Sequence, residues 1–319
     1  MPDASIRYLS RADVEAVGLS GVDVIEILDG AFRAKRAGDV EMPPKIGVHP
    51  REDAFIHAMP AYLSDTDAVG LKWVAGYPSN QPLGIPYIHG LFVLSDAATG
   101  RPLAVMDATW ITEVRTAAAS ILGIRALAEG PVESLGIIGC GRQGNVHLEL
   151  AEQVFPTLRR VGLFDRHRER ADALAAAHPN LEVQVASAAE GIAPGADVIV
   201  STAAIVRHPE RPLRRDHLAD ATVACAVDFD ATLSEDLFED AGMFVVDDIA
   251  QYRYYRQQGY FAGYPPEATE LAEVLAAEAP RAGGLNVYVP LGIALEDVAV
   301  AAEINRRAAD AGLGQALEL

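Results

Sequence analysis

Hydrophobic and polar positions follow two different patterns along the chain, and the change falls near residue 134. Before it, short runs that alternate apolar and polar residues are separated by turn residues, which is typical of strands with one buried face. After it, short continuous apolar runs alternate with stretches at helical spacing, which is typical of a parallel sheet covered on both faces. The pattern therefore predicts an α/β chain with two domains.

The part before residue 134 is expected to open with helices. Ser10 as N-cap with Asp13 in the first turn predicts a helix start, and apolar residues at helical spacing over 22–37 predict a second helix that Gly38 ends. Strands are then predicted over 41–48, 54–62 and 68–75, a hairpin over 89–107, and a helix rich in small residues over 110–128.

The part after residue 134 is expected to form a Rossmann-type doubly wound parallel sheet. Its predicted strands cover 134–138, 160–165, 181–185, 196–203, 222–227 and 243–248, the last clear strand. A final helix over 292–307 is expected to return to the first domain. We therefore predict a second α/β domain of 1–116 and 294–319, into which the Rossmann domain of 117–293 is inserted.

A glycine-rich stretch follows the first strand of the predicted parallel sheet. Gly139, Gly141 and Gly144 satisfy G-x-G-x-x-G directly before a helical pattern. Gly139 permits a tight turn, Gly141 lets the backbone approach a pyrophosphate, and Gly144 lets the helix pack closely. The order of strand, glycines and helix favours a dinucleotide site over a glycine-rich turn in an ordinary α/β unit.

Asp165 ends the second strand, 21 residues past Gly144, the spacing expected for the acid that holds the adenosine ribose. A carboxylate there repels a 2′-phosphate and favours NAD over NADP, although Arg166 and Arg168 leave room for some NADP tolerance. The other residues expected to bind the cofactor are Arg142, Gln143, Arg166 and Thr202.

Composition and charge exclude several classes of protein. With 50% hydrophobic and 22% charged residues the chain has an ordinary globular composition, and no apolar run approaches a membrane span. No secretory signal opens the sequence, so we expect a cytoplasmic protein. The net charge of −19 argues against nucleic acid and anionic membranes as partners. Cys140 and Cys225 are interpreted as small buried residues, and no metal site is expected.

The cations are almost all arginines, and the lysines are only Lys35, Lys45 and Lys72. A lysine kept in such a background is expected where arginine cannot replace it. In its predicted strand Lys72 shares a face with Val74, so it either snorkels at an edge or lies buried against an anionic group, which we favour.

Three further groups of residues are candidates for function or packing. Arg115 lies in the helix of small residues, as either an exposed helix arginine or a binding residue. Asp228 and Asp230 follow the strand over 222–227, at the edge where doubly wound sheets bind ligands. The aromatic and basic stretch 252–261 is interpreted as helix packing rather than nucleic-acid contact.

Several of these motifs coincide with those of one family. The motifs are Met42-Pro-Pro-Lys45, Met59-Pro-Ala, Gly70-Leu-Lys72, Arg115-Thr-Ala-Ala, Gly139-Cys-Gly-Arg-Gln-Gly144 and Gly292-Ile-Ala-Leu-Glu-Asp297. Over essentially its full length the chain resembles the ornithine cyclodeaminase and mu-crystallin family. The resemblance implies a homodimer built through the strand-rich domain, and NAD(H)- or NADP(H)-dependent chemistry on small amino or imino acids.

The resemblance also implies roles for individual residues. Lys45, Lys72 and Arg115 match the cations that hold the substrate α-carboxylate, and Lys72 is expected to be catalytic. Asp230 matches the catalytic aspartate, which exchanges a proton with the substrate nitrogen, and Asp228 is the alternative. In the family the residues directly before this acid are usually glycines, whereas this chain has Asp228-Phe229 there.

Two positions depart from the family. His57 stands where the cyclodeaminases carry a glutamate that binds the terminal amine of ornithine, so ornithine is disfavoured. We expect His57 to bind substrate; the alternative is a neutral histidine bonded inside the sheet. At Val289-Pro-Leu-Gly292 many members carry a lysine-serine pair before the glycine, a difference that we do not interpret.

The leading hypothesis is the NADH-dependent reduction of a small 2-imino acid, or of a 2-oxo acid with ammonia, to an L-amino acid. The number of cations favours iminosuccinate, which would give aspartate. Two alternatives stay open: cyclodeamination of ornithine to proline, and a non-catalytic nucleotide- and ligand-binding protein like mu-crystallin.

Overall fold

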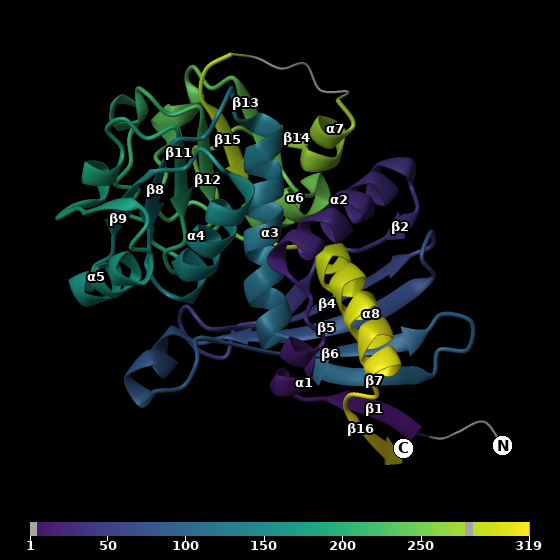
Figure 1. Ribbon diagram of the computed structural model, residues 1–319. Coiled ribbons are helices and arrows are strands. Elements are labelled where there is room, and N and C mark those ends of the chain that lie inside the picture. Colours follow the sequence, from purple (N-terminus) through teal and green to yellow (C-terminus); the bar gives the residue numbers. More distant parts are fainter. Residues whose placement is uncertain (1–4, 278–282, 319) are drawn as a thin grey trace. The chain divides into compact units, whose positions relative to one another are not determined.

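The computed structural model describes residues 5–277 and 283–318 of the 319-residue chain. The chain divides into two compact units, which are Met1–Arg115 with Gly292–Leu319, and Thr116–Leu291. Unit 1 is thus built from both ends of the chain and unit 2 from its middle. Figure 1 labels the elements of both.

Unit 1 contains a mixed sheet of eight strands in the part of the chain that the structure describes. Its order is β16-β1-β7-β6-β5-β4-β2, with β3 paired to β4, and every pair is antiparallel except β1 with β7. The strands are β1 (Ser5–Leu9), β2 (Val40–Glu41), β3 (Ile46–Val48), β4 (Phe55–Leu63), β5 (Ala68–Gly76), β6 (Ile88–Asp96), β7 (Pro102–Asp107) and β16 (Gln315–Glu318).

The helices of unit 1 are α1 (Arg11–Ala16), α2 (Gly21–Ala37) and α8 (Ala294–Ala311). Helix α8 packs across β4, β5 and β6 and against α2 (Figure 1). Side chains along β5 alternate accordingly: Lys72 is fully buried, whereas Leu71 and Trp73 are 39% and 41% exposed on the opposite face. The return of the last long helix to the first domain is thereby confirmed.

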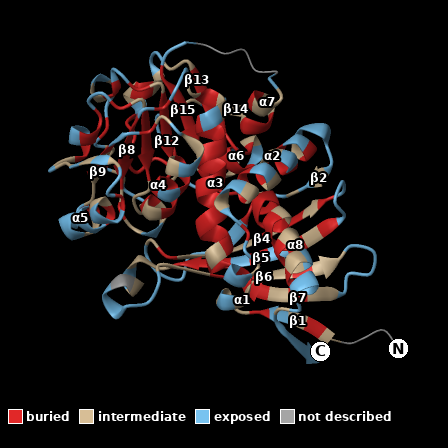
Figure 2. Cartoon of the chain, in the orientation of Figure 1, coloured by how far each residue is buried: buried red, intermediate tan, exposed pale blue. Residues whose placement is uncertain are grey.

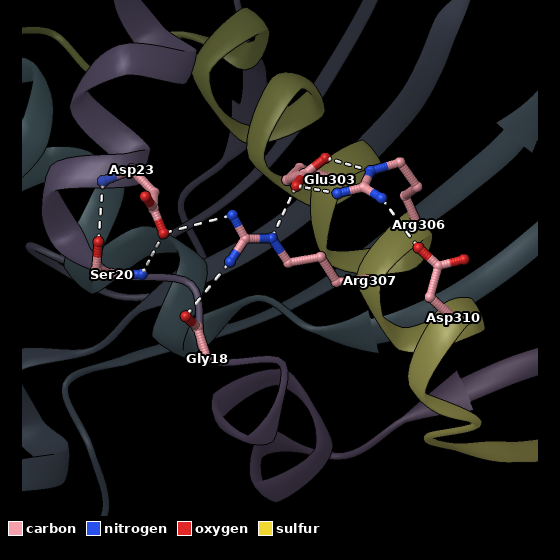
Figure 3. A network of polar contacts seen from close by, with 7 residues as sticks. All are labelled: Gly18, Ser20, Asp23, Glu303, Arg306, Arg307 and Asp310. Atoms are coloured by element: carbon pink, nitrogen blue, oxygen red, sulfur yellow. Dashed lines mark hydrogen bonds and ion pairs between the residues drawn. The ribbon is translucent and has the colours of Figure 1, made fainter.

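Two sequence signals at helix ends are confirmed: Ser10 and Asp13 form a capping box at the start of α1, and Gly38, with a φ of +88°, ends α2. A second capping box, which the sequence analysis did not predict, joins Ser20 and Asp23 at the start of α2. From α8, the guanidinium of Arg307 donates to Glu303 Oε1 over 2.8 Å and reaches Asp23 Oδ2 at 3.4 Å (Figure 3). This arginine therefore joins the second half of α8 to the start of α2.

Among the described residues, unit 2 contains a sheet of eight strands whose pairs are all parallel. Its order is β10-β9-β8-β11-β12-β15-β13-β14. The strands are β8 (Ser134–Ile138), β9 (Arg160–Phe164), β10 (Glu182–Val185), β11 (Val198–Ser201), β12 (Val223–Ala226), β13 (Met243–Val246), β14 (Thr269–Glu270) and β15 (Asn286–Val289). The strand order reverses between β8 and β11, which makes the edge beyond these strands the expected ligand site.

The remaining helices are α3 (Thr109–Leu127), α4 (Arg142–Val154), α5 (Arg168–Ala177), α6 (Ile249–Gln257) and α7 (Leu271–Leu275). Short 3-10 helices are η1 (Pro78–Leu83), η2 (Ala189–Ile192), η3 (Arg215–Leu218) and η4 (Glu235–Phe238). Helix α3 is buried over almost its whole length (Figure 2), which agrees with its small residues. The prediction of a doubly wound parallel sheet inserted in a second α/β domain is confirmed.

Some strands differ from the sequence prediction. The single strand expected over 41–48 is divided into β2 and β3, because Pro43 and Pro44 have no N–H to donate to a ladder. Strand β15 was not predicted, since the last clear strand was expected to end at 248, yet it lies between β12 and β13. The pairing of β1 with β16 was also missed, because β16 is exposed and carries no apolar alternation.

The aromatic stretch 252–261 belongs to the core of unit 2. Tyr252 and Phe261 are fully buried, and their ring centroids lie 5.1 Å apart. Its interpretation as helix packing is confirmed. Within residues 5–277 and 283–318, we find no helix with the length and apolar character needed to cross a membrane.

Candidate active site

The loop from β8 to α4 carries the three glycines of the G-x-G-x-x-G motif. Gly139 has a φ of +90°, which residues other than glycine rarely adopt. A Cβ on Gly144 would lie 2.1 Å from the carbonyl oxygen of Gly139, whereas a Cβ on Gly141 would meet no atom within 4 Å. The fold therefore requires Gly144 but not Gly141, and the open space beside Gly141 suits the approach of a pyrophosphate to the uncapped start of α4.

Two polar side chains hold this loop in shape. Thr202, which follows β11, donates from Oγ1 to the carbonyl oxygen of Gly139 over 2.7 Å. Asp165 accepts hydrogen bonds from the backbone N–H of Cys140 and of His167, both at 2.8 Å. The predicted cofactor residues Gly139, Gly141, Gly144, Asp165 and Thr202 are thus brought together at the switch point of the sheet.

The other residues predicted to bind the cofactor flank this loop. Arg142 and Gln143 are the first two residues of α4, with Arg142 exposed and Gln143 half-buried. Arg166 is exposed just beyond β9. Their contacts with a cofactor stay predictions.

In unit 1, Lys72 is fully buried in β5. Its Nζ donates to Asp297 Oδ1 over 2.6 Å and to Thr112 Oγ1 over 3.3 Å. Burial, assisted by the charge of Arg115, lowers the pKa of Lys72 to about 8, although Asp297 opposes the shift. The expectation of a lysine buried against an anionic group is confirmed.

Arg115 and Lys45 lie in the same unit. Arg115 is 6% exposed and donates to Glu296 Oε2 over 2.8 Å and to Asp297 Oδ1 over 3.1 Å, so it is not an exposed helix arginine. Lys45 Nζ donates to the carbonyl oxygen of Gly292 over 3.0 Å. Gly292 has a φ of +70°, and a Cβ there would lie 2.6 Å from Arg115 Nη1. This glycine therefore makes room for the guanidinium.

Two acids at the start of α8 complete the cluster. Glu296 and Asp297 are both fully buried, and one oxygen of each accepts no hydrogen bond from any residue that the structure describes. The pKa of Glu296 is raised, because the effect of burial outweighs the opposing charge of Arg115. Against the cations Lys45, Lys72 and Arg115, the two carboxylates leave one net positive charge. The cation count from sequence alone missed them, although both lie in the quoted motif 292–297.

His57 lies in β4, opposite Gly47 of β3. Its ring stacks on Phe55 with centroids 4.4 Å apart, and a Cβ on Gly47 would lie 2.2 Å from its Cδ2. Burial lowers the pKa of His57 to about 3, with further contributions from the charges of Lys45, His49 and Lys72. The histidine is therefore neutral, and no hydrogen bond joins its ring to a described residue, so it is not bonded inside the sheet.

The two candidate aspartates follow β12 in unit 2, and both are buried. Asp228 accepts hydrogen bonds from the hydroxyls of Ser201 and Thr232, both at 2.6 Å. The pKa of Asp228 is raised, because the effect of burial outweighs that of these hydrogen bonds. Asp230 instead forms an ion pair with Arg211, an arginine to which the sequence analysis assigned no role.

Comparison with protein families gives a match over nearly the whole chain. Residues 7–312 match the model of the ornithine cyclodeaminase/mu-crystallin family. The nodulation efficiency protein NfeD of Rhizobium meliloti is 46% identical over 153 residues, which cover 48% of this chain and 48% of that protein. The alignment thus spans about half the length of this relative. The alanine dehydrogenase of Archaeoglobus fulgidus is 28% identical over 324 residues and 97% of each chain.

Solved structures extend these similarities. An archaeal alanine dehydrogenase dimer with bound NAD has a TM-score of 0.87 at 28% identity, over 99% of each chain. The Δ1-pyrroline-2-carboxylate reductase of Thermococcus litoralis, in complex with NADH and L-proline, has a TM-score of 0.84 at 25% identity, over 97% of this chain and 99% of that chain. The iminosuccinate reductase of Paracoccus denitrificans has a TM-score of 0.83 at 22% identity, over 99% of this chain and 100% of that chain. At this identity the similarity supports the fold alone.

Proposed function

The chain belongs to the ornithine cyclodeaminase/mu-crystallin family, and we propose that it reduces a small 2-imino acid to an L-amino acid with NADH. The observation that carries this proposal is the buried cluster of Lys45, Lys72 and Arg115, with Glu296 and Asp297 beside it. Buried cations that keep one net positive charge form a binding site for one carboxylate.

The residues of the chain have distinct roles in this proposal. Lys45, Lys72 and Arg115 bind the α-carboxylate and so orient the substrate carbon that is reduced. Asp230 exchanges a proton with the substrate nitrogen, with Asp228 as the alternative. A bound NADH supplies the hydride when it is present. Neutral His57 lines the place where the cyclodeaminases carry an acid, so no carboxylate there would bind the terminal ammonium of ornithine.

The cofactor in this proposal is NAD rather than NADP. The open space beside Gly141 suits a pyrophosphate, and Asp165 stands at the end of β9, where a carboxylate disfavours a 2′-phosphate. The bound NAD of the alanine dehydrogenase and the NADH of the pyrroline-2-carboxylate reductase support the same choice. Some tolerance of NADP through Arg166 and Arg168 stays part of the proposal.

The charge of the cluster bears on the substrate side chain. Three cations alone favoured iminosuccinate, which has two carboxylates. Because Glu296 and Asp297 balance two of these cations, we place first an imino acid with one carboxylate and a small uncharged side chain, such as the imine of pyruvate. Iminosuccinate becomes the second candidate. The proposed protein is a homodimer with a cytoplasmic location. The dimeric alanine dehydrogenase supports the homodimer.

A panel of 2-oxo acids with ammonium, together with Δ1-pyrroline-2-carboxylate, tests the proposal. We expect oxidation of NADH faster than of NADPH, and faster turnover of pyruvate than of oxaloacetate. Lys72→Ala should abolish turnover while NADH binding, followed by fluorescence, stays intact. If no member oxidises either cofactor, or if the variant retains its activity, the proposal fails. Formation of proline from ornithine without net change in NADH would instead support a cyclodeaminase.

A further inference from the structure

Asp230 is held by contacts on one side of its carboxyl group only. Oδ2 accepts hydrogen bonds from Arg211 Nη2 over 2.5 Å and from the backbone N–H of Phe261 over 2.9 Å. Arg211 Nε also donates to the backbone oxygen of Asp230 over 3.2 Å. Oδ1 accepts no hydrogen bond within residues 5–277 and 283–318. Asp230 is 3% exposed, so the orientation of its side chain is set by these contacts.

The backbone around Asp230 is strained in three places. Within the described residues, six residues other than glycine have a left-handed φ, and Arg211, Phe229 and Phe261 are three of them, at +51°, +62° and +59°. Two of these donate to Asp230, and the third precedes it in the chain. Such conformations persist only where the surrounding structure imposes them, and they cluster at functional sites.

Packing and pairing hold the three strained residues in place. Phe229 lies 4.7 Å from the ring of Tyr255 and 5.4 Å from that of Phe261. The guanidinium of Arg211 lies over Tyr264 at 5.4 Å and donates to Ala262 O over 2.7 Å. The backbone N–H of Arg211 donates to Ala231 O over 3.1 Å, which fixes Arg211 beside Asp230.

The charge of Arg211 is secure in this setting. Burial lowers the pKa of its guanidinium, but hydrogen bonds to Glu235 and Asp230 outweigh burial and raise it. The guanidinium binds Oδ2 and leaves Oδ1 as the carboxyl oxygen that can accept a further hydrogen bond. An ionised carboxylate can accept a hydrogen bond through Oδ1 from a cationic nitrogen.

We propose that Arg211 is a positioning residue, which holds Oδ2 of Asp230 so that Oδ1 accepts a hydrogen bond from the cationic nitrogen of the imino acid. This inference rests on the proposed function and deepens it. It assigns Asp230 the task of binding an iminium or ammonium group as a carboxylate. Arg211 acts through Asp230 and does not touch the substrate.

Arg211→Gln is the test variant, and Arg215→Gln is its matched control. Arg215 also pairs with an aspartate of unit 2, through Nε to Asp240 Oδ1 at 2.7 Å, but has no contact with Asp230. With NADH, ammonium chloride and either pyruvate or oxaloacetate, we expect Arg211→Gln to lower kcat by at least about tenfold. The Kd of NADH should change less than about twofold, and the control should match the wild type.

A double-mutant cycle separates action through Asp230 from a general structural effect. Asp230→Asn combined with Arg211→Gln should be no slower than Asp230→Asn alone, because the second change removes a contact that no longer orients a carboxylate. Multiplied losses, or wild-type kcat in Arg211→Gln, would overturn the inference. If Arg211→Gln does not fold, Arg211→Lys takes its place, since an ammonium keeps the charge but not the forked geometry.

¹³C carboxyl NMR tests the same contact without turnover. The Asp230 resonance is identified by its loss in Asp230→Asn. We expect its chemical shift to change in Arg211→Gln and to stay unchanged in Arg215→Gln, because Arg211 pairs with Asp230 and Arg215 pairs with Asp240. If the wild type reduces neither substrate, the proposed function is in doubt, and this chemical shift alone decides: a change supports the positioning role and no change overturns it.

Discussion

At the scale of single residues, burial in the cluster of unit 1 brings the pKa of a lysine close to neutral pH. Burial and the charge of Arg115 lower the pKa of Lys72 from 10.5 to about 8. The unfolded state therefore holds this proton at higher pH than the folded state does, and between these two values Lys72 makes the folded state more stable as the pH rises. The attraction of Lys72 for a carboxylate instead weakens as the pH rises, because the ammonium group loses its charge.

We therefore expect the Kd of pyruvate, measured by calorimetry, to rise as the pH increases through about 8, the pKa of Lys72. The rise should approach about tenfold per pH unit, because pyruvate stays anionic while the ammonium loses its charge. Binding of NADH should not follow this curve. Lys72→Arg keeps a permanent charge and should flatten the curve even if it binds pyruvate weakly. The same curve in that variant would contradict the role of Lys72.

Gly292 and Gly312 offer a matched pair of substitutions. Their φ angles are +70° and +65°, but only at Gly292 would a Cβ meet Arg115, whereas at Gly312 it would meet nothing within 4 Å. Gly312→Ala should cost about 1–2 kcal/mol of unfolding free energy through backbone strain. Gly292→Ala should cost about 1–3 kcal/mol more and also weaken pyruvate binding. Urea unfolding and calorimetry measure both, and equal effects would show that Arg115 moves away without cost.

At the scale of elements, the turn from β8 into α4 separates folding from binding. Gly144 lets α4 pack on the loop, since its Cβ would collide with the carbonyl oxygen of Gly139 at 2.1 Å. Gly141 has open space and serves no packing contact that we find in the described residues. The same motif thus contains two glycines that the fold needs, Gly139 and Gly144, and one that the ligand would need, Gly141.

Alanine substitutions at these two glycines should therefore behave differently. Gly144→Ala should lower the melting temperature, by an amount that corresponds to about 1–3 kcal/mol. Gly141→Ala should melt like the wild type but lose at least about tenfold in NADH affinity, because its methyl group would occupy the place of the pyrophosphate. Wild-type affinity in Gly141→Ala would contradict the proposed cofactor site.

At the scale of the whole molecule, one face of the sheet in unit 1 exposes a row of apolar side chains. Ile46, Ala58, Trp73 and Leu91 are paired across β3, β4, β5 and β6, so they form one row on that face. Ile46, Trp73 and Leu91 are 63%, 41% and 46% exposed. Contiguous apolar surface of this kind usually marks an interface. We expect a second copy of the chain to cover it.

Trp73→Glu should therefore shift the protein from dimer to monomer in analytical ultracentrifugation, with little change in the fold, because the side chain faces outward. Val22→Glu on α2, where the valine is 39% exposed, is the control and should leave the dimer intact. A wild-type monomer, or a dimer that survives Trp73→Glu, would remove this face from the proposed interface.

Local signals carried most of the element prediction. The capping box of α1, the glycine that ends α2 and the G-x-G-x-x-G turn depend on residues close together in sequence, so the sequence predicts them. Alternation along β5 likewise placed Lys72 on the face of Val74, where burial against an anionic group was favoured over snorkelling at an edge. The insertion of β15 between β12 and β13 was not visible, because the order of strands in a sheet is set by packing rather than by local pattern.

The fold class, the glycine loop and the set of cations thus follow from local patterns in the sequence. The charge of the cluster and the orientation of Asp230 depend instead on contacts between residues far apart in the chain. Asp297 contacts Lys72 across 225 sequence positions, and Arg211, whose φ is left-handed, contacts Asp230 across 19 positions. In a buried site the electrostatic energy depends on which charges are neighbours in space. A count of cations along the chain therefore missed the acids that balance them.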